Sequence, residues 1–361
     1  MGAASRRRRA PRARRRRVLA LFAALATLVS GNTALEAANR AAFPSTTTTG
    51  VSPQVRGVVP PEGAFWVFFP GFGIDFCPDV ERAFAPVTAA TGASFCVAPS
   101  PARLDPAEIA ATVRARVTAG RGRGPGGTTP PVTLYLYGIS MGGMIAYDVA
   151  RLLDGRDEIT VRALVFDSSP AGPDSVAGAK KTLVRLGAAI ERLPDLPGNI
   201  PNPLKGGPLN RFAAHVAEAA AADVQQRRPP DWARDIEFAW YKATRVTSDG
   251  VAAQLAYIEG FYPRRDPAAL PYAEFAYLRA DDPDADTTVD VQRAVASYAG
   301  LVAPRRLATY PIRGGFHASA DTTVASYREA LAAFSRDVAL PSRQDEARVD
   351  AASRGARPLS C

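Results

Sequence analysis

The chain has 361 residues, 47% of them hydrophobic, so it can bury a large core and form one domain of about 270 residues with flanking segments. Its formal net charge of +9 comes from the N-terminus, because nine of the 44 basic residues and none of the 35 acidic ones lie in residues 1–17. The rest is neutral, which argues against a nucleic-acid-binding role for the folded body. Two histidines without paired Cys/His spacing also argue against a zinc site.

The first segment has the pattern of a targeting sequence. The arginines are followed by thirteen uncharged residues, 18–30, and then by small residues near Gly31 and over 34–38. A basic, an apolar and a small-residue region in this order are typical of a secretory signal, and the apolar run is shorter than the roughly 20 residues that span a bilayer. We expect residues 1–31 to be a signal peptide or signal anchor, which makes the protein secreted or membrane-anchored. A transit peptide and a basic nucleic-acid-binding arm are the alternatives.

Strands and helices alternate along much of the remaining chain. Residues 32–58 are polar with little periodicity, and we expect a flexible linker there. Strands are expected at residues 64–69, 94–97, 132–137, 161–166, 273–278 and 307–312, with those at 64–69 and 161–166 buried. Helices are expected at residues 80–90, 106–117, 144–150, 289–298 and 322–333. This alternation predicts an α/β fold with a mostly parallel central sheet and helices on both faces.

The pattern changes in the middle of the chain. Helices interrupted by prolines are expected at residues 183–193, 210–224 and 232–245, which indicates an inserted helical cap over about residues 170–266. The whole domain is then expected to cover residues 59–340, followed by a polar C-terminal tail at residues 341–361.

A Gly-x-Ser-x-Gly motif at residues 138–142 stands between a strand pattern and a helical pattern. Ser140 therefore occupies the apex of a sharp strand-to-helix turn. Small residues two places before and after it, Gly138 and Gly142, are needed because the strand and the helix almost touch there. This context predicts that Ser140 is a nucleophile, with a plain glycine-rich turn as the alternative.

The order of the elements and the motif at Ser140 resemble the α/β-hydrolase family over residues 63–335. In that family the serine, the acid and the histidine of the catalytic triad follow one another in this order along the chain. His317 lies just after the last expected strand and before the last expected helix, so the resemblance implies that it is the general base. His215, on an expected cap helix, is the alternative.

The acid of the triad has several candidates. Asp281, Asp282, Asp284 and Asp286 all follow the strand expected at residues 273–278. The segment from Asp286 to Val289 is similar to the family's Asp-x-x-Val sequence before a helix, so Asp286 is the preferred acid. Asp282 and Asp284 are alternatives, and so is Asp167, because some family members place the acid after the preceding strand.

An acyl-transfer site also needs donors for an oxyanion. The amide of Met141, at the start of a helix, is expected to be one of them. The resemblance implies a second donor from the loop after the first buried strand, where we assign the amide of Phe72, with Gly73 as its alternative. Pro70 departs from the family here, because it stands where histidine is usual.

The sequence therefore predicts a serine hydrolase that cleaves a carboxylic ester, thioester or amide through an acyl-enzyme. No cofactor is implied, and the expected partner is a small-molecule or lipid acyl substrate, with no nucleic acid and with membrane association through the N-terminal segment. A catalytically silent binding protein of the same fold and an acyltransferase on the same triad are the alternatives. Cap aromatics that could line an acyl pocket are Phe238, Trp240, Tyr241, Tyr257, Phe261 and Tyr262.

The three cysteines are compatible with two states. Cys77, in an expected loop, and Cys96, at the end of an expected strand, can form a disulfide, or both can be buried free thiols. Cys361 is left without a partner in either state.

Overall fold

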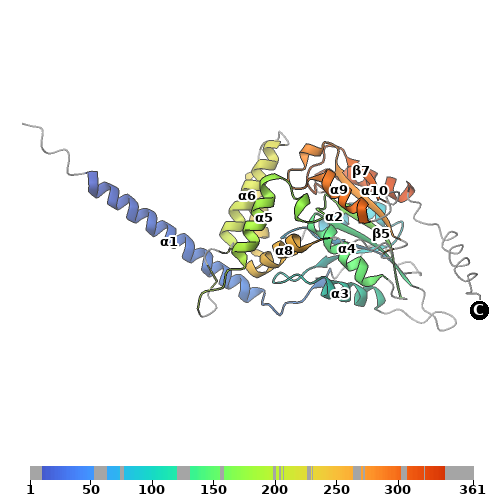
Figure 1. Cartoon of the computed structure of the whole chain (residues 1–361), viewed down its shortest axis with the longest axis horizontal. Helices are drawn as coiled ribbons and strands as arrows, with labels where there is room; N and C mark the ends of the chain where they lie inside the picture. Colours follow the sequence, from blue (N-terminus) through green and yellow to red (C-terminus); the bar gives the residue numbers. More distant parts are fainter. Residues whose placement is uncertain are drawn as a thin grey trace, which may run out of the picture. The chain divides into compact units, whose positions relative to one another are not determined.

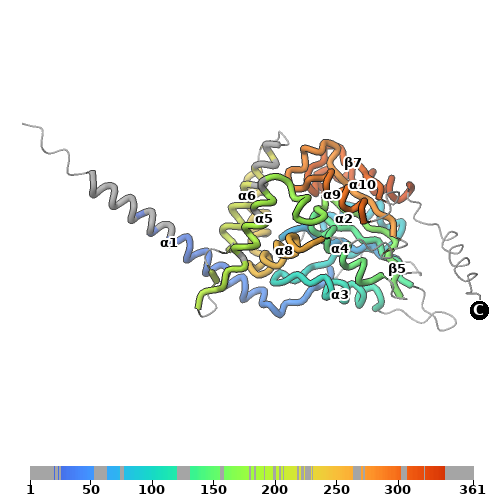
Figure 2. The backbone as a smooth tube through the Cα atoms, viewed as in Figure 1, coloured from blue at the N-terminus to red at the C-terminus, as the bar shows by residue number. Residues whose placement is uncertain are grey.

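The computed structural model describes residues 10–52, 63–73, 77–119, 131–154, 158–197, 201–202, 205, 207–225, 229, 231–262, 270, 273–301, 307–320 and 322–337. Figure 1 labels most of the helices and the strands β5 and β7, and Figure 2 traces the course of the backbone. The chain divides into two compact units. The sheet unit is Thr49–Pro99, Asp105–Thr182 and Ile258–Cys361, and the helical unit is Met1–Thr48, Ser100–Leu104 and Leu183–Tyr257.

The sheet unit is built on a seven-stranded sheet with the order β1-β3-β2-β4-β5-β6-β7. Its strands are β1 (Gly50–Val51), β2 (Ala64–Phe69), β3 (Ala93–Ala98), β4 (Val132–Ile139), β5 (Ile159–Asp167), β6 (Glu274–Ala280) and β7 (Leu307–Ile312). The short edge strand β1 pairs antiparallel with β3, and the other neighbouring strands pair in parallel. The predicted mostly parallel sheet is confirmed, and β1 is an addition that the sequence pattern does not predict.

Helices cover both faces of this sheet. They are α2 (Cys77–Thr88), α3 (Pro106–Thr118), α4 (Met141–Leu153), α9 (Val291–Leu301) and α10 (Val324–Asp337). Successive side chains of a strand point to opposite faces. On one face, Trp66 of β2 belongs to a core cluster with Phe84 of α2 and Tyr327 of α10. On the other, Phe166 of β5 stacks on Tyr298 of α9, with ring centroids 4.0 Å apart.

The helical insertion lies between β5 and β6 in the sequence. It contains α5 (Gly178–Glu191), α6 (Pro208–Gln225), α7 (Trp232–Thr244) and α8 (Ser248–Gly260). The part that belongs to the helical unit, Leu183–Tyr257, is narrower than the expected cap at residues 170–266. α8 is not predicted from the sequence, and Ser100–Leu104 also joins this unit although it follows β3.

The N-terminal helix α1 (Ala10–Ala42) differs from the expected flexible linker at residues 32–58. Asn32, Glu36 and Asn39 follow one another at helical spacing and are all buried. Because a buried face made of polar side chains leaves no apolar periodicity, the sequence pattern does not reveal it. Residues 32–42 are part of the folded helical unit, so the linker prediction is wrong for them. Residues 53–58 lie outside the described part of the chain.

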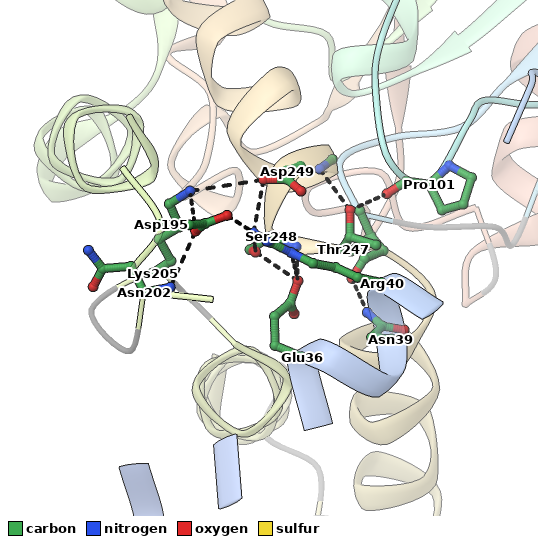
Figure 3. Close-up of polar contacts among 12 residues, drawn as sticks. Glu36, Asn39, Arg40, Pro101, Asp195, Asn202, Lys205, Thr247, Ser248 and Asp249 are labelled. Carbon is green, nitrogen blue, oxygen red and sulfur yellow. Dashed lines mark hydrogen bonds and ion pairs between the residues drawn. The ribbon is translucent and has the colours of Figure 1, made fainter. Parts of the chain in front are cut away.

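A network of charged and polar groups holds the end of α1 in the helical unit (Figure 3). Glu36 accepts hydrogen bonds from both the amide and the hydroxyl of Ser248, each at 2.7 Å, and pairs with Arg211 at 3.1 Å. Arg40, one turn later, forms an ion pair with Asp195 at 2.6 Å. The side chains of Glu36 and Arg211 are both almost fully buried, and Glu36 also pairs with Arg40 at 3.4 Å, so its charge is balanced by two cations.

Two further expectations can be compared with the described residues. Cys77 and Cys96 form a disulfide, and Cys77 is the first residue of α2 rather than part of a loop. Among the helices described, none combines the length and the apolar character needed to cross a membrane. Cys361 and the expected tail at residues 341–361 lie outside the described residues.

Candidate active site

The predicted site residues follow the carboxyl ends of neighbouring parallel strands. Register pairs Ile139 at the end of β4 with Asp167 at the end of β5, and Asp167 with Leu278 of β6. Loops that follow strands aligned in this way open on the same edge of the sheet, which is where ligands bind in open α/β sheets. Ser140 follows β4 directly, and His317 follows β7.

Ser140 stands at a strained turn between β4 and α4. Its backbone has φ 51° and ψ −122°, a conformation that residues other than glycine rarely adopt. A Cβ at Gly138 would overlap the backbone of Gly143, and a Cβ at Gly142 would overlap the carbonyl groups of Phe69 and Pro70. Gly138 is therefore required because β4 and α4 approach closely. Gly142 is required because α4 approaches the end of β2 and the loop that follows it.

Ser140, His317 and Asp286 form one chain of hydrogen bonds. The Oγ of Ser140 lies 2.9 Å from Nε2 of His317. The other ring nitrogen, Nδ1, lies 3.1 Å from each carboxylate oxygen of Asp286. In the tautomer that carries its proton on Nδ1, His317 donates to Asp286 and accepts from the Ser140 hydroxyl, which is the arrangement of a serine activated by a base.

The carboxylate of Asp286 is held in place by the backbone that follows it. Its Oδ1 accepts hydrogen bonds from the amides of Thr288 and Val289, each at 2.9 Å. Burial raises the pKa of Asp286, but His317 and these two amides outweigh it, so the pKa lies below its usual value. The side chain therefore stays ionised, as a partner for an imidazolium must.

The other acidic candidates do not contact His317 in this way. Asp281, Asp282 and Asp284 are exposed. Asp281 accepts from the amide of Gly314, and Asp282 accepts from the amide of Asp284 in a short 3₁₀ turn. His215, the alternative base, lies on α6 in the helical unit.

Asp167 is a buried carboxyl group beside the site. Its two oxygens accept hydrogen bonds from the hydroxyls of Tyr137, at 2.9 Å, and Tyr327, at 2.8 Å. Burial raises the pKa of Asp167 to about 7, although the two tyrosines and His317 act in the opposite direction. Asp167 is one of the alternative acids expected from the sequence, but the sequence pattern does not identify Tyr137 and Tyr327 as its partners.

The assigned oxyanion donors come from the residue after Ser140 and from the loop after β2. Met141 is the first residue of α4, where the amides of a helix point away from intrahelical partners. The loop after β2 passes close by, because a Cβ at Gly71 would lie 3.4 Å from the Cβ of Ser140. Phe72 is the next residue along this loop, so its amide and that of Met141 remain the predicted donors.

The aromatics considered for an acyl pocket have different surroundings. Phe261 is buried and packs edge-on against Tyr147 at 6.3 Å between centroids, whereas Phe238, Trp240 and Tyr262 are exposed. Tyr262 lines a hollow of about 330 Å³ together with residues of the loop after β5 and of α9. Ser140 does not line that hollow, so it is not assigned as the acyl pocket.

This sheet order, with the serine turn after β4, Asp286 after β6 and His317 after β7, is an α/β-hydrolase fold with a helical insertion. Solved structures agree, at low sequence identity. An esterase from Thermogutta terrifontis (TM-score 0.51, 15% identity) matches 80% of this chain and 93% of its own. MGS-M2, an α/β-hydrolase enzyme from a Medee basin deep-sea metagenome library (0.54, 10%), matches 79% and 93%. An acetylester hydrolase from Corynebacterium glutamicum (0.52, 11%) matches 77% and 88%.

These likenesses establish the fold and confirm the resemblance seen in the sequence. No known protein family matches the sequence itself, and no curated protein does.

Proposed function

We propose that the protein is a serine hydrolase that cleaves a carboxylic ester, thioester or amide of a small-molecule or lipid acyl substrate. The observation that carries the proposal is the continuous hydrogen-bond chain from Ser140 through His317 to the buried, ionised Asp286. The fold that it shares with esterases and hydrolases is compatible with this chemistry, but a fold alone does not define a function.

In the proposed reaction, Oγ of Ser140 attacks the acyl carbonyl carbon while its proton passes to Nε2 of His317. Asp286 holds the ring and stabilises the imidazolium that forms. The negative charge on the carbonyl oxygen is stabilised by the amides of Met141 and Phe72. The bond to the leaving group then breaks, and the proton on His317 goes to the departing alcohol, thiol or amine.

Water completes the cycle. His317 takes a proton from water, the hydroxide attacks the acyl-enzyme, and the carboxylic acid leaves as Ser140 regains its proton. An acyltransferase would use the same steps with an acceptor alcohol or amine in place of water.

Labelling with a fluorophosphonate probe tests the nucleophile without knowledge of the substrate. The wild-type chain should be labelled, and Ser140→Ala should not. Ser168→Ala is the matched control, since Ser168 also has a positive φ near the same edge of the sheet, but its hydroxyl is buried and has no hydrogen-bond partner among the described residues. Labelling that persists in Ser140→Ala would assign the nucleophile to another residue. A folded wild-type chain that is not labelled would favour a silent binding protein.

We also propose that residues 1–31 direct the protein to export or to a membrane anchor. Mass spectrometry of the N-terminus of the mature protein tests this. Cleavage near Gly31 would indicate a signal peptide, and intact residues 1–31 in the membrane fraction would indicate an anchor. Intact residues 1–31 on a protein in the cytoplasm would contradict the proposal.

A further inference from the structure

Helix α7 carries its large apolar side chains on the outside. Its buried positions are the small residues Ala239 and Ala243, whereas Trp232, Ile236 and Trp240 are 52%, 47% and 43% exposed. These three residues are four positions apart, so they follow one another along one side of the helix. We call them the α7 stripe.

An exposed stripe of this composition is unusual for a protein surface that faces only water. Contiguous apolar patches on soluble proteins mark sites that contact another molecule or a membrane. Tryptophan in particular favours the boundary between lipid tails and water, because its ring is apolar and its N–H is polar. A helix with such a face can lie in the headgroup region of a bilayer.

The same unit carries a strong positive charge. Nine arginines lie in residues 1–17, which together with α1 belong to the helical unit. Leu28 and Val29 of α1 are also exposed, and the network around Glu36 fixes the end of this helix to the unit that contains α7 (Figure 3). An anionic lipid surface attracts such a basic segment electrostatically.

We propose that the helical unit, in the chain that retains residues 1–31, docks on an anionic bilayer surface, with the α7 stripe in the headgroup region and the arginine segment bound to lipid phosphates. A second copy of the chain is a poorer occupant. The stripe supplies three large side chains, whereas a stable interface needs roughly 800 Å² from each partner.

The chain's own tryptophans allow a direct test. It has three, and Trp66 is buried in the sheet unit at 1% exposure, so Trp232 and Trp240 are the two whose emission can respond to lipid. The full chain is titrated with vesicles of phosphatidylcholine, with and without phosphatidylglycerol. We expect a blue shift of emission and co-flotation with the anionic vesicles, with affinity at least about tenfold weaker without phosphatidylglycerol.

Substitutions distinguish lipid binding by the α7 stripe from lipid binding by the arginine segment. Trp232→Ser with Ile236→Ser should weaken binding to anionic vesicles about tenfold or more, and Trp240 remains as the reporter. Leu152→Ser is the matched control, because Leu152 is an exposed leucine of α4 in the sheet unit, and its binding should equal that of the wild type. Circular dichroism checks that each variant is folded.

Three results would overturn the proposal. One is a wild-type chain that shows no blue shift and no flotation with anionic vesicles. Another is a folded stripe variant that binds anionic vesicles as tightly as the wild type, which would assign all lipid binding to the arginine segment. The third is self-association, measured by light scattering, that is lost in the stripe variant without any change in lipid binding. Ser140→Ala should bind vesicles normally, so the outcome is independent of hydrolase activity.

Discussion

The amide of Ser140 donates a hydrogen bond to the carbonyl oxygen of Asp167 over 2.8 Å. This bond ties the strained turn of the serine to the end of β5. The side chain of Asp167 is itself fixed by Tyr137 and by Tyr327 of α10, the helix that follows the His317 loop. Strained backbone persists only where its surroundings fix it, and Asp167 supplies part of that support.

Loss of either end of the hydrogen-bond chain should abolish turnover. Ser140→Ala and His317→Ala are each expected to lower the turnover of a short acyl ester by several orders of magnitude, because the two act as one unit. The double variant should lose no more than either single one. Additive losses, measured as kcat under saturating ester, would show that the residues act independently.

Removing the charge of the acid should be nearly as harmful. Asp286→Asn is expected to lower turnover by about 10³ to 10⁴, since the amide no longer fixes the tautomer or balances the imidazolium. Asp284→Asn is the control, because Asp284 is an exposed acid close in sequence. Turnover near that of the wild type in Asp286→Asn would return the role to Asp282, Asp284 or Asp167.

Asp167 should make stability depend on pH. The folded chain holds this proton up to a pKa of about 7, whereas an unfolded aspartate releases it near pH 4. Raising the pH through this window therefore favours the unfolded chain, and the contribution is complete below about pH 4 and lost above about pH 7. In Asp167→Asn this pH dependence should be absent.

The measurement is the melting temperature of both proteins from pH 5 to pH 8, followed by circular dichroism at about 222 nm, where helix dominates. Asp167→Asn should gain relative to the wild type as the pH rises. A difference between the two that stays constant over the whole range would contradict the raised pKa.

Close approach at the serine turn should make Gly138 intolerant of any side chain. Gly138→Ala forces a Cβ into the backbone of Gly143, so we expect a loss of unfolding free energy of about 3 kcal/mol or more, and loss of activity. Gly50→Ala is the matched control, since a Cβ there would meet nothing within 4 Å. Equal melting temperatures for the two variants would show that the turn can relax.

Truncations should locate the boundary of the folded N-terminus. Removal of residues 1–31 leaves Glu36 and its contacts in place, so the melting temperature should change little. A chain that starts at Val51 lacks Glu36 and therefore its buried ion pair with Arg211, at a cost of about 3–5 kcal/mol. Limited proteolysis of the 183–257 segment should then be faster. Equal protection of both truncated chains would place the Glu36 network outside the stabilising contacts.

The sequence predicted those parts of the molecule in which local pattern and global structure agree. Strands β2 to β6 are largely buried apolar runs, and the glycines around Ser140 indicate a turn that the structure contains. β7 is predicted from the same kind of pattern, although only two of its six residues are buried. The pairing of Ser140 with His317 follows from chain order and from a shortage of histidines. The choice of Asp286 over its neighbours depends on which carboxylate contacts the imidazole of His317, and the spacing of the aspartates in the sequence does not determine this contact.

The sequence failed where tertiary contacts reverse the usual meaning of a residue. The buried face of α1 at Asn32, Glu36 and Asn39 is polar, so it reads as exposed chain. α8, which the sequence does not predict, contains Gly250 in its first turn, and a Cβ there would collide with the carbonyl of Pro101. The tyrosine pair that holds Asp167 comes from β4 and α10, far apart in the chain.

The polar face of α1 also suits the order in which the protein is made. Arg211 follows Glu36 by 175 residues, so at roughly 5–20 residues per second α1 leaves the ribosome about 10–35 s before its partner exists. An apolar face of the same size would expose hydrophobic surface, which promotes aggregation with other nascent chains, throughout that interval. Asn32, Glu36 and Asn39 are polar and can instead hydrogen-bond to water during that interval. They exchange these bonds for bonds within the protein only after the later helices have been synthesised.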